Sequence, residues 1–248
     1  MHLLKRSMHI LQQSNSGDKA VVLSERLFTI VKSLPKNAVV CDVGSDHGAL
    51  PLFLLKEFDF SKVIVTDLNP KPLERAKENL FQAGVADRAC FLLTDGIENV
   101  FTYQPDVFVI AGMGGETISG ILDRAILKIP IGTKFVLQPM TREETLRSFL
   151  YEFGFAITDE KVVFENNKFF PIIWCTFVGE KSEKKSNDCF LGEFLPKDQS
   201  ESTKLYFQFL LKRVEKKLKG KESVGENAEI ERMQRELLCS LIGGYYED

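Results

Sequence analysis

The sequence has five cysteines, a single tryptophan and no long apolar run. The cysteines are widely spaced and none forms a Cys-x-x-Cys pair, so neither a disulfide framework nor a zinc site is expected. No apolar run approaches the roughly 20 residues that span a bilayer, and the polar segment 12–16 interrupts any signal-peptide core. We therefore expect a cytoplasmic protein without a metal and without a membrane partner.

The chain also lacks a strong charge bias. Its 32 Lys and Arg residues nearly balance 35 Asp and Glu residues, and the formal net charge of −3 disfavours a surface coated for nonspecific nucleic-acid binding. A hydrophobic content of 44% is ordinary for globular proteins. At 248 residues the chain exceeds the roughly 100–200 residues of one domain, so one large domain or a domain with an appendage is expected.

The clearest linker is the charged stretch 181–187, which contains no apolar residue. It separates a predicted α/β domain at 21–180, preceded by an extension at 1–20, from a C-terminal unit at 188–248. In the α/β domain, β-branched runs alternate with helical patterns, as in βαβ units. The predicted strands are 38–43, 62–66, 89–94, 107–111, 134–137, 156–164 and 170–177, the last two flanking a polar turn at 165–168. This order predicts a Rossmann-like, doubly wound sheet of seven strands, five parallel and two in an antiparallel hairpin.

Three helix boundaries can be predicted. Ser24 is a candidate N-cap for an apolar stripe at 27–34, and the Asn-Pro pair at 69–70 starts a helix that Gly84 can end. The Thr-x-x-Glu spacing at 141–144 predicts a capping box. Ligands of doubly wound sheets bind beyond the carboxyl ends of the strands, so a site is expected there.

The first predicted strand runs into residues 42–48, Asp-Val-Gly-Ser-Asp-His-Gly. In the turn at Asp42, Gly44 and Ser45, the glycine lets the backbone approach a ligand closely. The helix that follows has free N–H groups at its start, which favour a carboxylate or a phosphate. The spacing D-x-G-x-x-x-G differs from the G-x-G-x-x-G of dinucleotide folds, which disfavours a pyrophosphate cradle. A plain tight connection is the alternative.

Acidic residues end the next two strands. Asp67, followed by Leu68, can accept hydrogen bonds from both ribose hydroxyls of a nucleoside; its alternative role is to cap the following helix. Asp95 can accept from an adenine amino group, and Gly96 lets the chain turn, although Asp-Gly is also a common plain turn.

Three glycines follow the fourth strand, in the run Ala111-Gly112-Met113-Gly114-Gly115. This bare surface suits a planar group or a sulfonium chain that passes close to the backbone, with Met113 as a soft wall. A purely structural glycine run is the alternative. Together the four strand ends predict a site for a nucleoside without phosphates, and hence S-adenosylmethionine as the cofactor of a class I methyltransferase.

These motifs resemble those of one known family, the bacterial tRNA (adenine-22-N1)-methyltransferases (TrmK). The matching strings are Leu-Ser-Glu-Arg-Leu at 23–27, Asp-Val-Gly-Ser-Asp-His at 42–47, Asp-Gly at 95–96, Ile-Ala-Gly-Met-Gly-Gly at 110–115, Leu-Gln-Pro at 137–139 and Phe-Leu-Gly-Glu-Phe-Leu at 190–195. The resemblance implies that the chain methylates N1 of adenine 22 in tRNA. It also implies a Rossmann-like catalytic domain at 21–180 and a C-terminal antiparallel helical hairpin.

The resemblance assigns roles to individual residues. Asp46 would accept a hydrogen bond from the N6 amino group of the target adenine, and His47 would position the base or the methionine part of the donor. A turn-stabilising contact and a helix cap are the respective alternatives. Arg26 would pair with the donor carboxylate or an RNA phosphate, unless it is an ordinary exposed arginine. Gln138 and Pro139 would form a wall on the target side.

Three positions depart from the family pattern. Gly48-Ala49 stands where the family usually has Ala-Tyr, which removes an aromatic that could stack on adenine. Asp67 replaces a more usual Glu, and Met140 stands where Asn is frequent.

The tail pattern is that of two helices around a turn at 220–226. Their apolar stripes are Phe207, Leu210, Leu211, Val214 and Leu218, then Ile230, Met233, Leu237 and Leu241. Segment 204–221 has seven basic residues and one acidic residue, whereas 222–248 has seven acidic and two basic. Either the acidic helix simply packs on the basic one, or the basic helix grips the tRNA backbone through Lys212, Arg213, Lys216, Lys217 and Lys219.

Two other functions stay open on the sequence alone. One is a methyltransferase of another RNA, a protein or a small molecule, and the other is a non-catalytic scaffold that binds the donor. The intact Asp67, Asp95 and Ala-Gly-Met-Gly-Gly run favour an enzyme over a scaffold. The sequence leaves the oligomeric state open and favours a monomer.

Overall fold

The computed structural model describes residues 23–183 and 186–244. The predicted extension at 1–20 lies outside this part of the chain. Among the helices described, none is both long and apolar enough to cross a bilayer.

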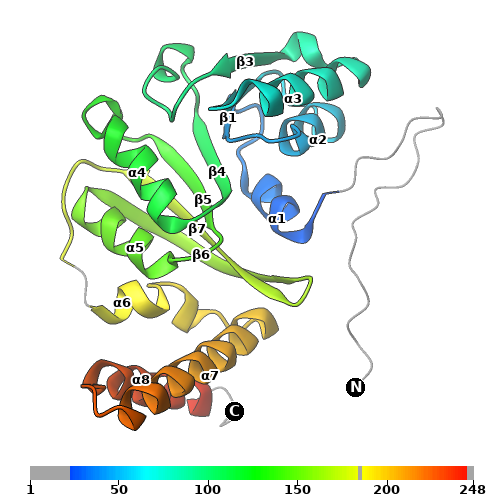
Figure 1. Ribbon diagram of the computed structural model, residues 1–248. Helices are drawn as coiled ribbons and strands as arrows, with labels where there is room; N and C mark the ends of the chain where they lie inside the picture. The colour runs from blue at the N-terminus through cyan, green and yellow to red at the C-terminus, as the bar shows by residue number, and fades with distance from the viewer. Residues whose placement is uncertain (1–22, 184–185, 245–248) are drawn as a thin grey trace.

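A seven-stranded sheet forms the centre of the molecule, in the order β3-β2-β1-β4-β5-β7-β6 (Figure 1). Strands β1 to β5 are parallel, whereas β7 pairs antiparallel with both β5 and β6. The strands are β1 Val40–Val43, β2 Val63–Asp67, β3 Ala89–Leu93, β4 Val107–Met113, β5 Lys134–Pro139, β6 Phe155–Glu165 and β7 Lys168–Phe177. The predicted Rossmann-like α/β fold is confirmed, and β4 and β5 each extend two residues further than predicted.

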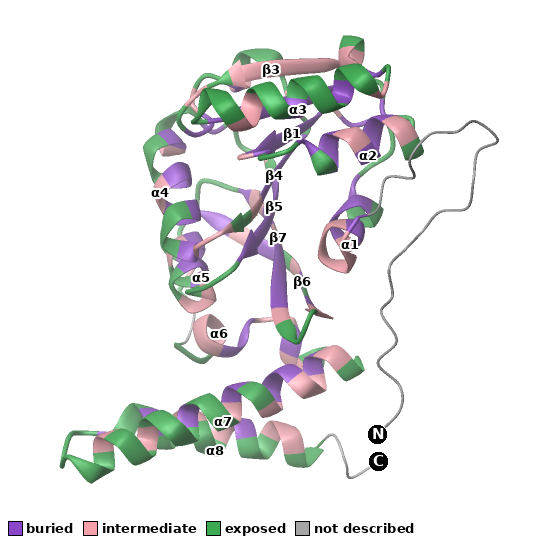
Figure 2. Cartoon of the chain, turned by 45° about the vertical axis from the view of Figure 1, so that its right-hand side comes forward, coloured by how far each residue is buried: buried purple, intermediate pink, exposed green. Residues whose placement is uncertain are grey.

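Helices cover both faces of the sheet. They are α1 Glu25–Ser33, α2 Ala49–Glu57, α3 Pro70–Gln82, α4 Gly115–Ala125, α5 Glu143–Glu152, α6 Ser186–Leu191, α7 Glu201–Ser223 and α8 Glu229–Gly244. One buried apolar cluster joins the sheet to α1, α2 and α3, and a second joins it to α4 and α5. The central strands are accordingly buried on both sides, as Figure 2 shows, which explains their nearly continuous apolar sequences.

Two local predictions are confirmed by the backbone. The Ser24 hydroxyl caps α1 by accepting from the Leu27 N–H, and Gly84 has a left-handed φ of 70° just after α3. The hairpin between β6 and β7 turns on Asn166 and Asn167, with φ values of 50° and 60°. Asn tolerates this left-handed conformation better than most residues, which suits a two-residue turn.

The predicted capping box at 141–144 is wrong. Helix α5 begins at Glu143, and its N-cap is Arg142, with φ 59° and no side-chain cap bond. The carbonyl of Thr141 instead accepts from the Gly115 N–H at 2.7 Å, and a side chain on Gly115 would collide with the Arg142 carbonyl. Packing of this loop against the start of α4 therefore overrides the local capping signal.

The predicted C-terminal pair of helices is confirmed, with two corrections. Helix α7 continues through Gly220 to Ser223, so the connection to α8 comes after residue 223 and not at 220–226. Ile230 and Met233 are 64% and 60% exposed, and so do not belong to the packed stripe. Glu231 and Leu238 are the buried residues of α8 instead, and Glu231 accepts from Lys217 and Lys221 of α7 at 3.0 and 2.9 Å.

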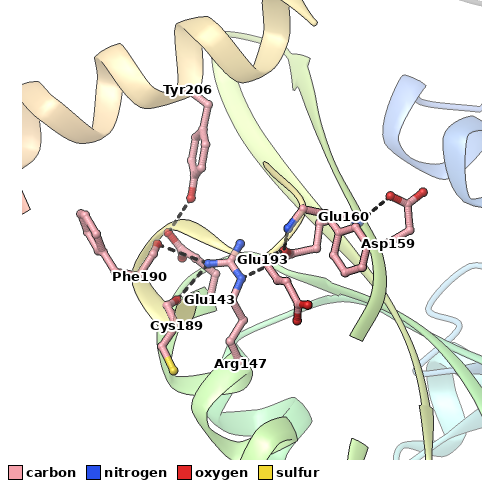
Figure 3. A network of polar contacts seen from close by, with 9 residues as sticks. Glu143, Arg147, Asp159, Glu160, Cys189, Phe190, Glu193 and Tyr206 are labelled. Carbon is pink, nitrogen blue, oxygen red and sulfur yellow. Dashed lines mark hydrogen bonds and ion pairs between the residues drawn. The ribbon is translucent and has the colours of Figure 1, made fainter. Parts of the chain in front are cut away.

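A buried ion pair joins the C-terminal unit to the α/β domain (Figure 3). Arg147 of α5 and Glu160 of β6 are both buried, with Nε donating to Oε1 at 2.7 Å. Arg147 also donates to the carbonyls of Cys189 and Phe190. The other oxygen of Glu160 accepts the backbone N–H groups of residues 193 and 194, at 2.7 and 3.1 Å. The pair therefore holds the turn between α6 and α7 against the sheet.

We predict that Arg147→Met destabilises the protein by about 3–5 kcal/mol, because Glu160 would stay buried without its cation. Urea unfolding followed by circular dichroism measures the loss. Arg235→Ala is the matched control: Arg235 lies 3.7 Å from Glu215 on an exposed surface, so its removal is expected to change stability by less than about 1 kcal/mol. Equal losses in the two variants would contradict the role assigned to the buried pair.

Candidate active site

The end of β1 is a tight turn tied to β2. The N–H groups of Gly44 and Ser45 both donate to the carbonyl of Thr66, at 2.9 and 3.1 Å. Gly44 has a φ of 74°, and the methyl group of Met113 from β4 fills the space where its Cβ would stand. The ends of β1, β2 and β4 therefore meet at one edge of the sheet, as the strand-end argument predicts.

Gly48 shows why one family position differs in this chain. It is the N-cap of α2, with φ 70°, and a Cβ there would lie 2.9 Å from the Cβ of Ala76 on α3. An alanine at this position would need α3 to move. The close approach of α3 to this turn therefore requires the glycine that this chain has at position 48.

Asp67 offers an acceptor at the end of β2. The residue is only 9% exposed, and its Oδ1 accepts from the N–H of Asn69 at 2.8 Å. Within the described chain, the second carboxylate oxygen has no hydrogen-bond partner. Asn69 is the N-cap of α3 but makes no side-chain cap bond, and the adjacent Leu68 is 60% exposed. Asp67 thus holds the turn and keeps one oxygen available for a ligand hydroxyl.

The glycine run after β4 is built around a β-bulge. The pairing with β5 shifts register between Ala111 and Met113, and Gly112 has a φ of 83°. The Gly112 N–H leaves the strand ladder and donates to the side-chain oxygen of Gln138, at 3.2 Å. A glycine is needed at position 115 because the Arg142 carbonyl leaves no room for a side chain there. At Gly112, by contrast, the run presents a bare and exposed surface.

Arg26 reaches this edge from α1. It is half-buried, its Nη1 donates to Gln138 Oε1 at 2.5 Å, and its guanidinium lies 5.4 Å from the ring centre of Phe170. Burial lowers the pKa of Arg26, although nearby Glu165 opposes that shift. The remaining N–H groups of the guanidinium have no described partner and can bind a carboxylate.

Asp46 and His47 are open to solvent at the same turn. Their side chains are 72% and 56% exposed, and His47 Nε2 lies 3.6 Å from Asp46 Oδ1. His47 does not cap α2, whose N-cap is Gly48. Both side chains are therefore accessible to a large partner such as a nucleic acid.

Asp95 has a partner in the structure. Its Oδ1 accepts from Nη2 of Arg124 on α4, at 2.8 Å, and both side chains are about half exposed. Gly96 follows with a φ of 84°, so the Asp-Gly pair does form a turn. Any ligand that binds Asp95 shares the carboxylate with this arginine.

Gln138 and Pro139 are buried in β5. Gln138 is 0% exposed, and its amide group is fully used: besides the two bonds accepted by its oxygen, its Nε2 donates to the Pro139 carbonyl at 2.8 Å and to Met140 Sδ at 3.7 Å. In this conformation neither residue is presented to a large substrate.

Several contacts at this edge had no signal in the sequence. The Glu165 carboxylate accepts from the backbone N–H of Arg26 at 3.3 Å, and the Phe170 ring packs against the Arg26 guanidinium. Both residues come from a hairpin about 140 residues further along the chain. No group of three or more His, Cys, Asp or Glu side chains that could hold a metal occurs among residues 23–183 and 186–244.

Asp42 is the buried acid beneath the turn. Burial raises its pKa to about 7, a shift that the Ser45 hydrogen bond opposes and the charge of Asp67 reinforces. The folded protein therefore takes up a proton at Asp42 that the unfolded chain, with an ordinary pKa of 3.8, releases at lower pH. The protonated Asp42 therefore adds to the free energy of unfolding. This stabilisation is fully present below about pH 4 and is lost as the pH rises through 7.

We predict that Asp42→Asn removes this pH dependence. The free energy of unfolding of the wild type, relative to the variant, should fall by about 1–3 kcal/mol between pH 5 and pH 8, because Asn cannot ionise. Urea unfolding at both pH values measures the difference. Asp123→Asn, at an exposed position of α4, is the control and should not change with pH in this way. A constant difference between wild type and Asp42→Asn would contradict the shifted pKa.

Comparisons with known proteins show which family the chain belongs to. A family model described as a methyltransferase domain matches residues 23–173. The tRNA (adenine(22)-N(1))-methyltransferase of Bacillus subtilis (strain 168) is 28% identical over 186 residues, which cover 72% of this chain and 76% of that protein. A Streptococcus pneumoniae structure, described as a candidate tRNA (m1A22) methyltransferase in complex with S-adenosyl-L-methionine, has a TM-score of 0.77 at 26% identity and covers 89% of this chain and 99% of its own. The resemblance predicted from the motifs is confirmed: the chain belongs to the methyltransferase domain family and, within it, is similar to the tRNA (adenine-22-N1)-methyltransferases.

Proposed function

We propose that this chain transfers a methyl group from S-adenosylmethionine to N1 of adenine 22 in tRNA. The observation that carries the proposal is the edge where β1, β2 and β4 end, which combines a bare glycine surface with buried and exposed carboxylates. The Bacillus subtilis relative, named for this activity, supports the choice of substrate. A tRNA-modifying enzyme works where tRNA is found, so we propose a cytoplasmic location. We also propose that the protein is a monomer.

The residues at this edge suit the donor. Asp67 has a free oxygen that can accept from a ribose hydroxyl, and the spare N–H groups of Arg26 can bind the methionine carboxylate. Gly44 and Gly112, both at positive φ, let the backbone come close to the nucleoside and the sulfonium chain. Asp42, Ser45, Leu68, Asp95, Gly96, Ala111 and Met113 complete the proposed donor site.

The chemistry asks little of the protein beyond alignment. When bound, S-adenosylmethionine supplies a methyl carbon that is electrophilic because it is attached to a sulfonium. N1 of neutral adenine carries a lone pair and no proton, so no strong base is needed to create the nucleophile. Asp46 accepts a hydrogen bond from the N6 amino group, which raises electron density at N1 and stabilises the cation that forms. His47, next to Asp46, holds the base in line.

The basic helix α7 is the proposed second contact with tRNA, and its cations fall into two groups. Lys217 pairs with buried Glu231, and Arg213 lies 3.8 Å from Glu143 of α5. Both line a groove of about 790 Å³ whose opposite wall carries Glu143, Glu144 and Glu152, so their charge is partly offset. Lys212, Lys216 and Lys219 are exposed and have no described partner. Their i, i+4, i+7 spacing puts them on one face of the helix, where they can contact successive phosphates.

The proposed function predicts that the protein converts adenine to 1-methyladenosine in unmodified tRNA when labelled S-adenosylmethionine is supplied. Nucleoside analysis by mass spectrometry identifies the product. A tRNA with guanine at position 22 is the matched control and should stay unmodified. Donor binding without any 1-methyladenosine would disprove the assigned reaction.

For Asp46 we predict a loss of turnover of at least about 100-fold in Asp46→Ala, with donor affinity kept, because only the contact with the target base is removed. Single-turnover rates and donor affinity by calorimetry separate the two effects. Asp59→Ala is a suitable control, since Asp59 is also an exposed Asp with a left-handed φ, of 52°. Full turnover in Asp46→Ala would remove the role given to this carboxylate.

For α7 we predict that replacing Lys212, Lys216 and Lys219 together by alanine weakens tRNA binding by about 10-fold or more and lowers the salt dependence of binding. Fluorescence anisotropy at several salt concentrations measures both. The control replaces three exposed lysines at the amino ends of strands β1, β2 and β5, which are Lys36, Lys62 and Lys134. Unchanged affinity in the α7 variant would show that the basic helix does not hold tRNA.

A further inference from the structure

Gln138 joins three segments through one amide oxygen. Its Oε1 accepts from Arg26 Nη1 of α1 at 2.5 Å and from the Gly112 N–H of β4 at 3.2 Å, while the residue itself belongs to β5. Its Nε2 is held by the Pro139 carbonyl at 2.8 Å, which fixes the orientation of the amide. The side chain is completely buried.

The bulge in β4 makes this oxygen necessary. At Gly112 the register of β4 against β5 shifts, so the Gly112 N–H has no carbonyl partner in the ladder. Gly112 is exposed as a residue, but its N–H points to the buried side chain of Gln138, where a missing acceptor would be costly; the half-buried guanidinium of Arg26 also needs an acceptor. Gln138 meets both demands with one atom, and thereby fixes the distance between Arg26 and the glycine run.

We propose that Gln138 is a positioning residue of the donor site and does not touch the target adenine. It holds the Gly112 backbone in its left-handed conformation and aims the free N–H groups of Arg26 over it. A Cβ on Gly112 would lie 3.7 Å from Arg26 Nη1, so the guanidinium lies beside the Gly112 backbone at an ordinary contact distance. This inference rests on the proposed methyltransferase function, and it reverses the prediction that Gln138 forms a wall on the target side.

The experiment measures donor affinity without RNA. Gln138→Leu keeps a similar volume but removes the acceptor, so the affinity for S-adenosylmethionine, measured by calorimetry, should fall about 10-fold or more. Gln138→Glu keeps an acceptor for Arg26 and Gly112 but loses the Nε2 donor to the Pro139 carbonyl, so its loss of affinity for S-adenosylmethionine should be clearly smaller than that of Gln138→Leu. The affinity of the protein for tRNA alone should be unchanged in both variants.

A double-mutant cycle with Arg26 tests whether Gln138 affects the affinity for S-adenosylmethionine through Arg26. Because Gln138 acts partly through Arg26, the losses of donor affinity in Gln138→Leu and Arg26→Ala should be less than additive when combined. The single tryptophan reports on folding, since Trp174 Nε1 donates to the Ser33 hydroxyl of α1 at 2.8 Å. Tryptophan fluorescence emission equal to that of the wild type would show that α1 is still in place in the variants.

Wild-type donor affinity in Gln138→Leu, with weaker tRNA binding or a higher KM for tRNA, would overturn the proposal and return Gln138 to the target side. Equal loss of donor affinity in the Leu and Glu variants would overturn it too, because the shared oxygen would then not matter. If the protein fails to methylate tRNA but the Leu variant loses clearly more donor affinity than the Glu variant, the proposed function fails and the positioning role stands.

Discussion

The buried ion pair between Arg147 and Glu160 is the constraint on which the arrangement of the molecule depends. Neither charge can stay in the interior alone, so α5, β6 and the turn at 189–194 must all be in place together. Gly192, at φ 89°, has no room for a side chain because Glu160 lies against it. The turn that leads into the C-terminal helices is thereby held against the sheet.

A second constraint acts at the carboxyl edge of the sheet, where polar groups serve different purposes at close range. Asp42 is buried deeply enough to raise its pKa to about 7, while Asp67 is engaged by a backbone N–H and keeps one free oxygen. Gln138 compensates for the backbone group that the bulge at Gly112 exposes. The same edge therefore provides acceptors for a nucleoside and supports for the bare backbone beside it.

The tail illustrates why net charge is a poor guide to partners. Over the whole chain the formal charge is −3, yet α7 carries an excess of basic residues and α8 an excess of acidic ones. Part of that contrast is used internally, since Glu231 holds Lys217 and Lys221. The three exposed lysines of α7 without a described partner, Lys212, Lys216 and Lys219, are the ones proposed to contact an RNA backbone, which is compatible with an overall acidic protein.

Local pattern was enough to predict the sheet and to place its strand ends within about two residues, because strand and helix periodicities and glycine turns are encoded within a few residues of one another. The family followed from the resemblance of short motif strings. The tertiary structure decided what depends on distant neighbours. The start of α5 follows from packing on Gly115 and not from Thr141, and the phase of α8 follows from the pairing of Glu231 with α7. The contact of Arg26 with Gln138 spans 112 residues of sequence, so only the closed fold could bring these two side chains together. Burial and hydrogen-bond demand over such separations have no local signature, which is why the sequence could predict a site at the strand ends but not the contacts that these residues make with one another.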